Sequence, residues 1–109
     1  MNRKFVYTQY FEKRWKDLGL TDENLLRLED TLKEDFHVGK VIRGTNGLRK
    51  MRFAFSHKGK RSGARVCYID IEIKETVFFM DVYSKHEKVD LSADEIKLIN
   101  KAIVILKGE

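Results

Sequence analysis

The spacing of apolar residues changes near Gly39, and this change limits which folds the chain can adopt. In residues 9–18 and 22–35 the apolar side chains lie three or four positions apart, as on one face of an amphipathic helix. Beyond Gly39 they alternate with polar side chains, as in half-buried β-strands. A last helical pattern follows Ser92. These patterns favour an α+β sandwich of two layers, with helices against one face of an antiparallel sheet.

The predicted element order is β-α-α-β-β-β-β-α. Strands are expected at residues 4–8, 41–42, 49–56, 66–73 and 77–83, and helices at 9–18, 22–35 and 93–107. Thr21 is a favourable N-cap, and Ser92 and Glu95 form a capping box at the start of the last helix. Residues 74–76 would form a tight hairpin connection. We expect residues 1–109 to form a single domain.

One face of the predicted sheet is expected to be open to solvent. The helices would cover one side, so the other side would carry Lys50, Arg52, Tyr68 and Tyr83 in phase. Cations and tyrosine rings on one surface suit contact with phosphates and stacking on bases. Strand tyrosines also serve as half-buried packing residues in many sheets, and the pattern leaves that alternative open.

Positive charge is concentrated in the middle of the chain. Between Phe36 and Ile69 there are nine Lys or Arg residues and no Asp or Glu, although the whole chain carries a net charge of only +5. The nine are Lys40, Arg43, Arg49, Lys50, Arg52, Lys58, Lys60, Arg61 and Arg65. Such a segment is typical of proteins that bind a polyanion, because their cations release condensed counterions. A solvated surface would explain an excess of lysine, but not the absence of acids from so long a stretch.

The cysteine and the histidines exclude further kinds of site. Cys67 is the single cysteine, so no intrachain disulfide can form, and its strand pattern indicates a buried structural thiol. His37, His57 and His86 are scattered, with no Cys or His at ligand spacing, so we expect no zinc site and no cofactor. The N-terminus has no apolar stretch long enough for a signal peptide or a membrane span. A soluble, cytoplasmic protein is therefore expected.

Three segments together resemble a known family. Residues 39–54 (GKVIRGTNGLRKMRFA), 58–68 (KGKRSGARVCY) and 83–92 (YSKHEKVDLS) are similar, in this order, to segments of the RelE/HigB-like toxins of bacterial type II toxin–antitoxin modules. The match resembles the HigB-type branch in particular. It implies a ribosome-dependent endoribonuclease that cuts messenger RNA in the decoding site, with no metal, through the RNA 2′-hydroxyl. It also implies a cognate antitoxin of the helix-turn-helix type that inactivates the toxin. We expect a monomer alone and a hetero-oligomer with that partner.

The resemblance also implies roles for the basic residues. Arg65 matches the phosphate-stabilising arginine of the family, and residues 58–61 lie in its basic loop along the RNA backbone. The expected catalytic residues are Arg65, Lys58, Lys60 and His86, of which the lysines and the histidine are candidates for proton transfer. The expected RNA-binding residues are Arg49, Lys50, Arg52, Arg61, Tyr68, Tyr83 and Lys85. For His86, an exposed loop histidine without a catalytic role is an equally weighted alternative.

Two features keep other functions open. Some relatives carry a tyrosine at the start of the last helix, where this chain has Asp90, Leu91 and Ser92. Arg65 alternates in phase with Cys67, so it reaches RNA only from a strand end or a bulge. The alternatives are a non-catalytic module that binds RNA or the ribosome through the same basic face, and an interaction protein whose basic face binds an acidic protein.

Overall fold

The secondary structure follows the predicted order. The structure is a computed structural model that describes residues 2–54 and 63–108. Its elements are β1 (Lys4–Tyr7), α1 (Gln9–Asp17), α2 (Asp22–Glu34), β2 (Lys40–Val41), β3 (Arg49–Ala54), β4 (Gly63–Ile71), β5 (Thr76–Ser84) and α3 (Ala93–Lys107). The α+β class is confirmed. Within these ranges no helix is long and apolar enough to cross a membrane.

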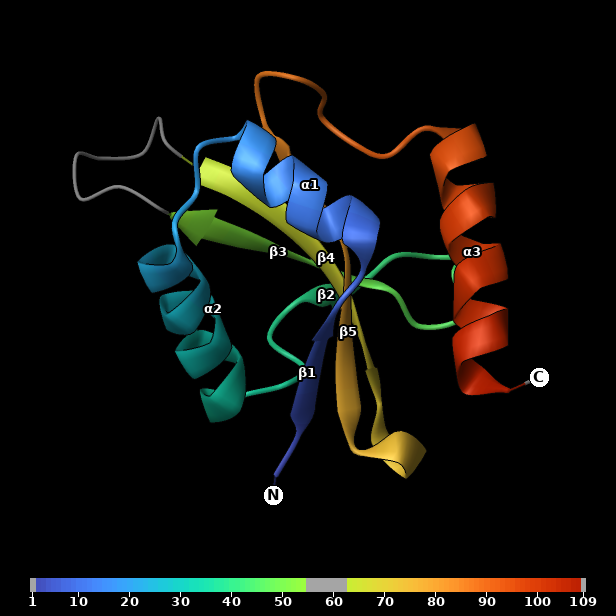
Figure 1. Ribbon diagram of the computed structural model, residues 1–109. Coiled ribbons are helices and arrows are strands. Elements are labelled where there is room, and N and C mark those ends of the chain that lie inside the picture. Colours follow the sequence, from blue (N-terminus) through green and yellow to red (C-terminus); the bar gives the residue numbers. More distant parts are fainter. Residues whose placement is uncertain (1, 55–62, 109) are drawn as a thin grey trace.

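The five strands form one sheet in the order β1-β5-β4-β3-β2 (Figure 1). Strands β2 to β5 pair antiparallel with their neighbours, as expected. The first strand differs, because β1 lies parallel to β5 at the edge of the sheet. This arrangement brings the N-terminal strand beside the last strand, and α1 starts where β1 ends, with Thr8 as its N-cap.

The helices cover both faces of the sheet, so the expectation that they pack on one face is wrong. On one face, α1 and α2 contribute Phe11, Trp15 and Leu28 to a core that includes side chains of β3, β4 and β5. On the other face, Ile103 of α3 packs in a second core that includes Cys67. Figure 1 shows α3 on the side of the sheet away from α2. Since β4 is apolar on both faces, it lies in the middle of the sheet and is buried from both sides.

The two tyrosines that were expected on an open face are fully buried. Tyr68 belongs to the core under α1 and α2, whereas Tyr83 belongs to the core under α3. The hydroxyl of Tyr68 donates to the carbonyl of Phe36 (3.0 Å) and accepts from the N–H of Gly39 (2.9 Å). The prediction that Tyr68 and Tyr83 stack on RNA bases is therefore wrong. Tyr83 is buried by the second helical layer, α3. Tyr68 lies on the other face of the sheet, away from Lys50 and Arg52, where α1 and α2 cover it.

The helix starts are as expected. Thr21 caps α2 through a capping box with Asn24, and Ser92 caps α3 through a capping box with Glu95. The connection between β4 and β5 differs slightly, since residues 72–74 form a short 3₁₀ turn. Glu75 then closes the turn at φ +49°.

A buried carboxyl group lies beneath α3. Asp81 of β5 is 1% exposed, and its Oδ1 has no hydrogen-bond partner within the described residues. Burial raises the pKa of Asp81 to about 6, against a usual value near 3.8. The folded protein thus holds the proton of this group more tightly than the unfolded chain does.

We predict that Asp81→Asn stabilises the protein at neutral pH. Between about pH 4 and pH 6 the unfolded chain releases this proton before the folded one does, so stability falls as pH rises. The variant should not show this decrease in stability with pH. Its free energy of unfolding should exceed that of the wild type by about 1–3 kcal/mol at pH 8 and differ little from it at pH 4. Urea denaturation at both pH values measures this. An equal effect at the two pH values would contradict the explanation.

A candidate nucleic-acid interface

The strand register places like charges directly opposite each other. Lys40 of β2 pairs with Lys50 of β3, and Arg52 of β3 pairs with Arg65 of β4. Directly opposite residues of antiparallel strands point to the same face, and Lys50 and Arg52 are two positions apart. Four cations from three adjacent strands therefore lie on one face of the sheet. It is the face that α3 covers elsewhere, where Cys67 is buried.

These four cations line a hollow of about 620 Å³, which we call the basic hollow. Its wall also includes Val89 and Asp90, from the loop between β5 and α3. Its remaining lining residues are Thr31, Val38 and Met51. The hollow joins the outer strands of the sheet to the loop that leads into the last helix.

Arg65 reaches the basic hollow because it lies near the start of β4. It is half-buried, and it is the third residue of the strand. The bulge in the β4–β5 pairing falls farther along, between Cys67 and Tyr68. Of the two routes by which Arg65 could reach a ligand, the structure therefore uses the strand end.

The cations of the hollow are only partly neutralised. Asp90 forms an ion pair with Lys50. Within the described part of the chain, Arg52 and Arg65 have no acidic partner and no side-chain hydrogen bond. Directly opposed like charges destabilise a sheet. An anion bound between these guanidinium groups would remove that repulsion, and arginine offers its planar fork to phosphate oxygens.

The loop that carries Asp90 is fixed by ion pairs to two helices. Glu87 pairs with Arg14 of α1 and accepts the N–H of Ser84 (2.9 Å), and this backbone hydrogen bond is the main cause of its lowered pKa. Lys88 pairs with Glu95 of α3, which lowers the pKa of that carboxyl. The loop is therefore held against the sheet.

Tyr83 lies under this part of the structure. It is the direct cross-strand partner of Arg65, and the ammonium group of Lys88 lies 5.0 Å from the centre of its ring. Burial raises the pKa of its hydroxyl. Tyr83 thus supports the residues of the hollow from below and presents no face to a base.

The other predicted site residues are distributed differently. Arg49 points away from the basic hollow, because its guanidinium donates to the backbone carbonyls of Gly39 (2.7 Å) and His37 (3.2 Å). Lys85 and His86 are exposed in the turn after β5. The predictions for Lys58, Lys60 and Arg61 lie outside the described residues.

Sequence reasoning missed two charged members of the hollow and one polar cluster. Lys40 was counted among the basic residues but given no role, and Asp90 was noted only for the tyrosine it replaces. Pairing of a short strand at Lys40 with the alternating pattern of β3 could have placed Lys40 beside Lys50. Nothing in the local sequence indicates that Asp90 contacts Lys50, which is 40 positions away. His37, Asp70 and Glu72 also come together, and they are the group within the described residues whose donor atoms are spaced for a metal ion.

Residues 3–107 match the family described as the RelE toxin of the RelE/RelB toxin–antitoxin system. The chain belongs to the RelE toxin family. One similar solved structure is the free E. coli toxin RelE with two arginines replaced by alanine: it has a TM-score of 0.61 and 18% sequence identity, and the match covers 95% of this chain and 99% of that one. Another is the intact E. coli RelBE toxin–antitoxin complex, with a TM-score of 0.57 and 26% identity over 75% of this chain and 95% of that one.

For this RelE-family chain the comparisons agree with the predicted family and fold. At 18% identity the free toxin supports the fold alone. The HigB-type branch stays a prediction, because the family and both similar structures are described as RelE. The residue roles likewise stay predictions.

We predict that Arg65→Gln does not destabilise the fold, because it removes one member of a like-charged pair. The free energy of unfolding should stay the same or rise by up to about 1 kcal/mol at low salt. The gain should shrink as salt screens the repulsion. Urea denaturation at low and high ionic strength measures this, with Lys101→Gln on the exposed surface of α3 as the control. A loss of more than about 1 kcal/mol would instead indicate a packing role for Arg65.

Proposed function

We propose that this RelE-family chain is a ribosome-dependent endoribonuclease that cuts messenger RNA, and that a cognate antitoxin neutralises it. The observation that carries the proposal is the pair of opposed arginines in a hollow with a single carboxylate, Asp90. A phosphodiester between Arg52 and Arg65 would relieve their repulsion. Membership of the RelE toxin family supports messenger RNA as the class of substrate, and the basic hollow is where we propose that it binds.

Metal-independent cleavage would use the RNA itself as the nucleophile. The 2′-oxygen attacks the adjacent phosphorus, a pentacovalent phosphorane forms, and the bond to the 5′-oxygen of the next nucleotide breaks. The extra negative charge of the phosphorane lies on its non-bridging oxygens. Arg52 and Arg65 would bind these oxygens, and their charge stabilises the transition state more than the ground state.

Two protons must also move. Asp90, held by Lys50, is the carboxylate of the hollow and would accept the proton of the 2′-hydroxyl. A cationic group would then donate a proton to the departing 5′-oxygen, and the predicted donors remain Lys58, Lys60 and His86. Ala54 and Gly63, the described residues that flank the segment with the two lysines, are Cα partners two positions beyond the Arg52–Arg65 pair.

The proposed binding partner of this chain is an antitoxin protein. The similar E. coli toxin is found in a complex with its antitoxin. By analogy, this chain would be a monomer alone and would form a hetero-oligomer with an antitoxin, for which we retain the helix-turn-helix type, in the cytoplasm. This part of the proposal is tested by co-expressing the neighbouring gene and measuring relief of growth arrest.

We predict that the purified protein cuts a reporter messenger in a translation extract, and that Arg65→Ala lowers the cleavage rate by at least about 100-fold. Primer extension on the recovered messenger maps and quantifies the cut ends. Arg65→Lys should recover only part of the rate, because an ammonium group lacks the planar fork. Lys101→Ala removes an exposed cation from α3 and should cut like the wild type.

The same experiment separates the nuclease from the alternative of a non-catalytic RNA- or ribosome-binding module. Such a module would bind ribosomes and block translation without producing cut ends. Cleavage by Arg65→Ala at the wild-type rate would contradict the placement of the site. Absence of cut ends with every variant, together with ribosome binding, would favour the module.

A further inference from the structure

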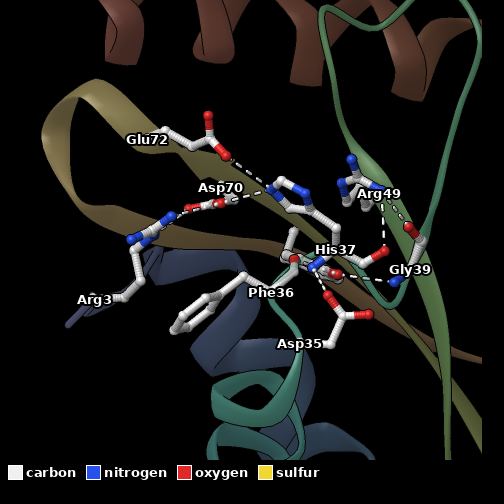
Figure 2. A network of polar contacts seen from close by, with 9 residues as sticks. Arg3, Asp35, Phe36, His37, Gly39, Arg49, Asp70 and Glu72 are labelled. Atoms are coloured by element: carbon white, nitrogen blue, oxygen red, sulfur yellow. Dashed lines mark hydrogen bonds and ion pairs between the residues drawn. The ribbon is translucent and has the colours of Figure 1, made fainter. Parts of the chain in front are cut away.

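A second cluster of polar groups lies away from the basic hollow. His37, in the segment that joins α2 to β2, faces Asp70 at the end of β4 and Glu72 in the following turn (Figure 2). The Nε2 atom of His37 lies 2.9 Å from Oδ2 of Asp70 and 3.2 Å from Oε1 of Glu72. One donor atom from each of the three residues lies within 4.8 Å of the other two. Asp70 is five positions from Arg65, about 16 Å along an extended strand.

The convergence of the three donor atoms favours a positive species between them, either a proton on Nε2 of His37 or a metal ion. A neutral imidazole nitrogen with a lone pair would repel both carboxylate oxygens. A proton on Nε2 can form one linear hydrogen bond, so only one of the two carboxylate oxygens has a well-aligned donor. A divalent cation can bind the nitrogen and both oxygens at once, and its charge adds to that of Arg3, which already pairs with Asp70.

The two distances from His37 fit a small ion. Zinc binds histidine nitrogen and carboxylate oxygen at about 2.0–2.2 Å, so two such ligands at angles between 90° and 109° are roughly 2.8–3.6 Å apart. The separations of Nε2 of His37 from Oδ2 of Asp70, 2.9 Å, and from Oε1 of Glu72, 3.2 Å, lie in this range. A larger ion such as calcium prefers six to eight oxygen ligands, and a histidine nitrogen does not suit it.

The surroundings fix these ligands in place, as outer contacts do in metal sites. Arg3 donates to both oxygens of Asp70, at 2.7 and 3.3 Å, and the Asp70 side chain is 1% exposed. The backbone N–H of His37 donates to Asp35 (2.9 Å), and its carbonyl accepts from Arg49. Figure 2 shows these contacts around the three ligands. Hydrogen bonds of this kind orient the ligands before an ion binds.

The cluster is also open to an ion. His37 and Glu72 are partly exposed, and all three residues line a hollow of about 520 Å³. Water from this hollow can complete the coordination of an ion held by three protein ligands. The Arg3 charge lowers the affinity of the site. Its shorter hydrogen bond, 2.7 Å, is to Oδ1 of Asp70, and the longer one, 3.3 Å, is to Oδ2, the oxygen that faces His37.

We propose that His37, Asp70 and Glu72 form a binding site for a zinc-type divalent ion. The ion joins the α2–β2 connection to the β4–β5 turn, and through Arg3 it strengthens the position of the N-terminal strand. Its role is structural, and it takes no part in RNA cleavage. The proposal is independent of the function proposed above.

The test is a zinc titration of the full-length, tag-free protein after treatment with a chelator, read by competition with a chromophoric zinc indicator. One ion should bind per chain, and the midpoint of thermal unfolding should rise by several degrees with zinc. Glu72→Gln should weaken zinc binding at least 10-fold. His37→Gln should weaken it similarly and remove the visible absorption changes that an imidazole ligand gives to bound Co²⁺.

Matched variants make the test specific. Glu75→Gln removes the same charge from the same turn but is not a ligand, and His86→Gln removes an exposed histidine elsewhere. Both should bind zinc like the wild type. Equal zinc affinities of Glu72→Gln and Glu75→Gln, or no binding by the wild type, would overturn the proposal, provided that circular dichroism shows folded protein. An unchanged RNA cleavage rate in Glu72→Gln would support a purely structural role.

Discussion

The feature on which the site depends is the pairing register of β2, β3 and β4. It sets Lys40 opposite Lys50 and Arg52 opposite Arg65, so two successive cross-strand pairs on one face are cationic. A register shift of one residue would turn each β3 side chain to the other face. Met51 and Phe53 prevent such a shift, because they fill the core under α1 and α2 and would become exposed. The apolar face of β3 therefore fixes the position of its cations.

The rest of the fold offsets the repulsion between these opposed cations. The core residues of β4 are buried from both sides, so the sheet does not depend on favourable charge pairs at its outer strands. The acids of the β5–α3 loop are used mainly to fix the loop: Glu87 holds α1, and Asp90 pairs with Lys50. The arginines keep their charge uncompensated within the described residues. The sheet therefore stays folded despite the repulsion between Arg52 and Arg65, and an anion that binds between them is favoured because it relieves this repulsion.

Much of the fold could be predicted from the sequence. Thr21 and Ser92 mark the helix starts by local capping chemistry, and the alternation in β3 separates its apolar side from Lys50 and Arg52. The layer of α3 could not be predicted, because the positions of helices on the two faces depend on chain connections that leave no local pattern. That error misplaced Tyr83, whereas Tyr68 was assigned to the wrong face of the sheet and lies in the core under α1 and α2.

Only part of the candidate site could be predicted, because local patterns indicate single residues but not the tertiary contacts between them. Arg52 and Arg65 carry their own signal as cations in strand patterns, although the sequence could not choose between a strand end and a bulge for Arg65. Asp90 and the His37 cluster join residues that are more than 30 positions apart. Such contacts arise from tertiary packing, and no spacing rule for nearby residues contains them.

The most direct test of the central claim is the salt dependence of binding to a short single-stranded RNA whose 2′-hydroxyls are replaced by hydrogen, so that it is not cut. The slope of the logarithm of the binding constant against the logarithm of salt concentration counts the phosphates that the protein neutralises. If the Arg52–Arg65 pair binds the backbone, the double variant with glutamine at both positions should have a slope shallower by about 1.4, since each cation contributes about 0.7 on a single strand. A slope equal to that of the wild type would contradict the account.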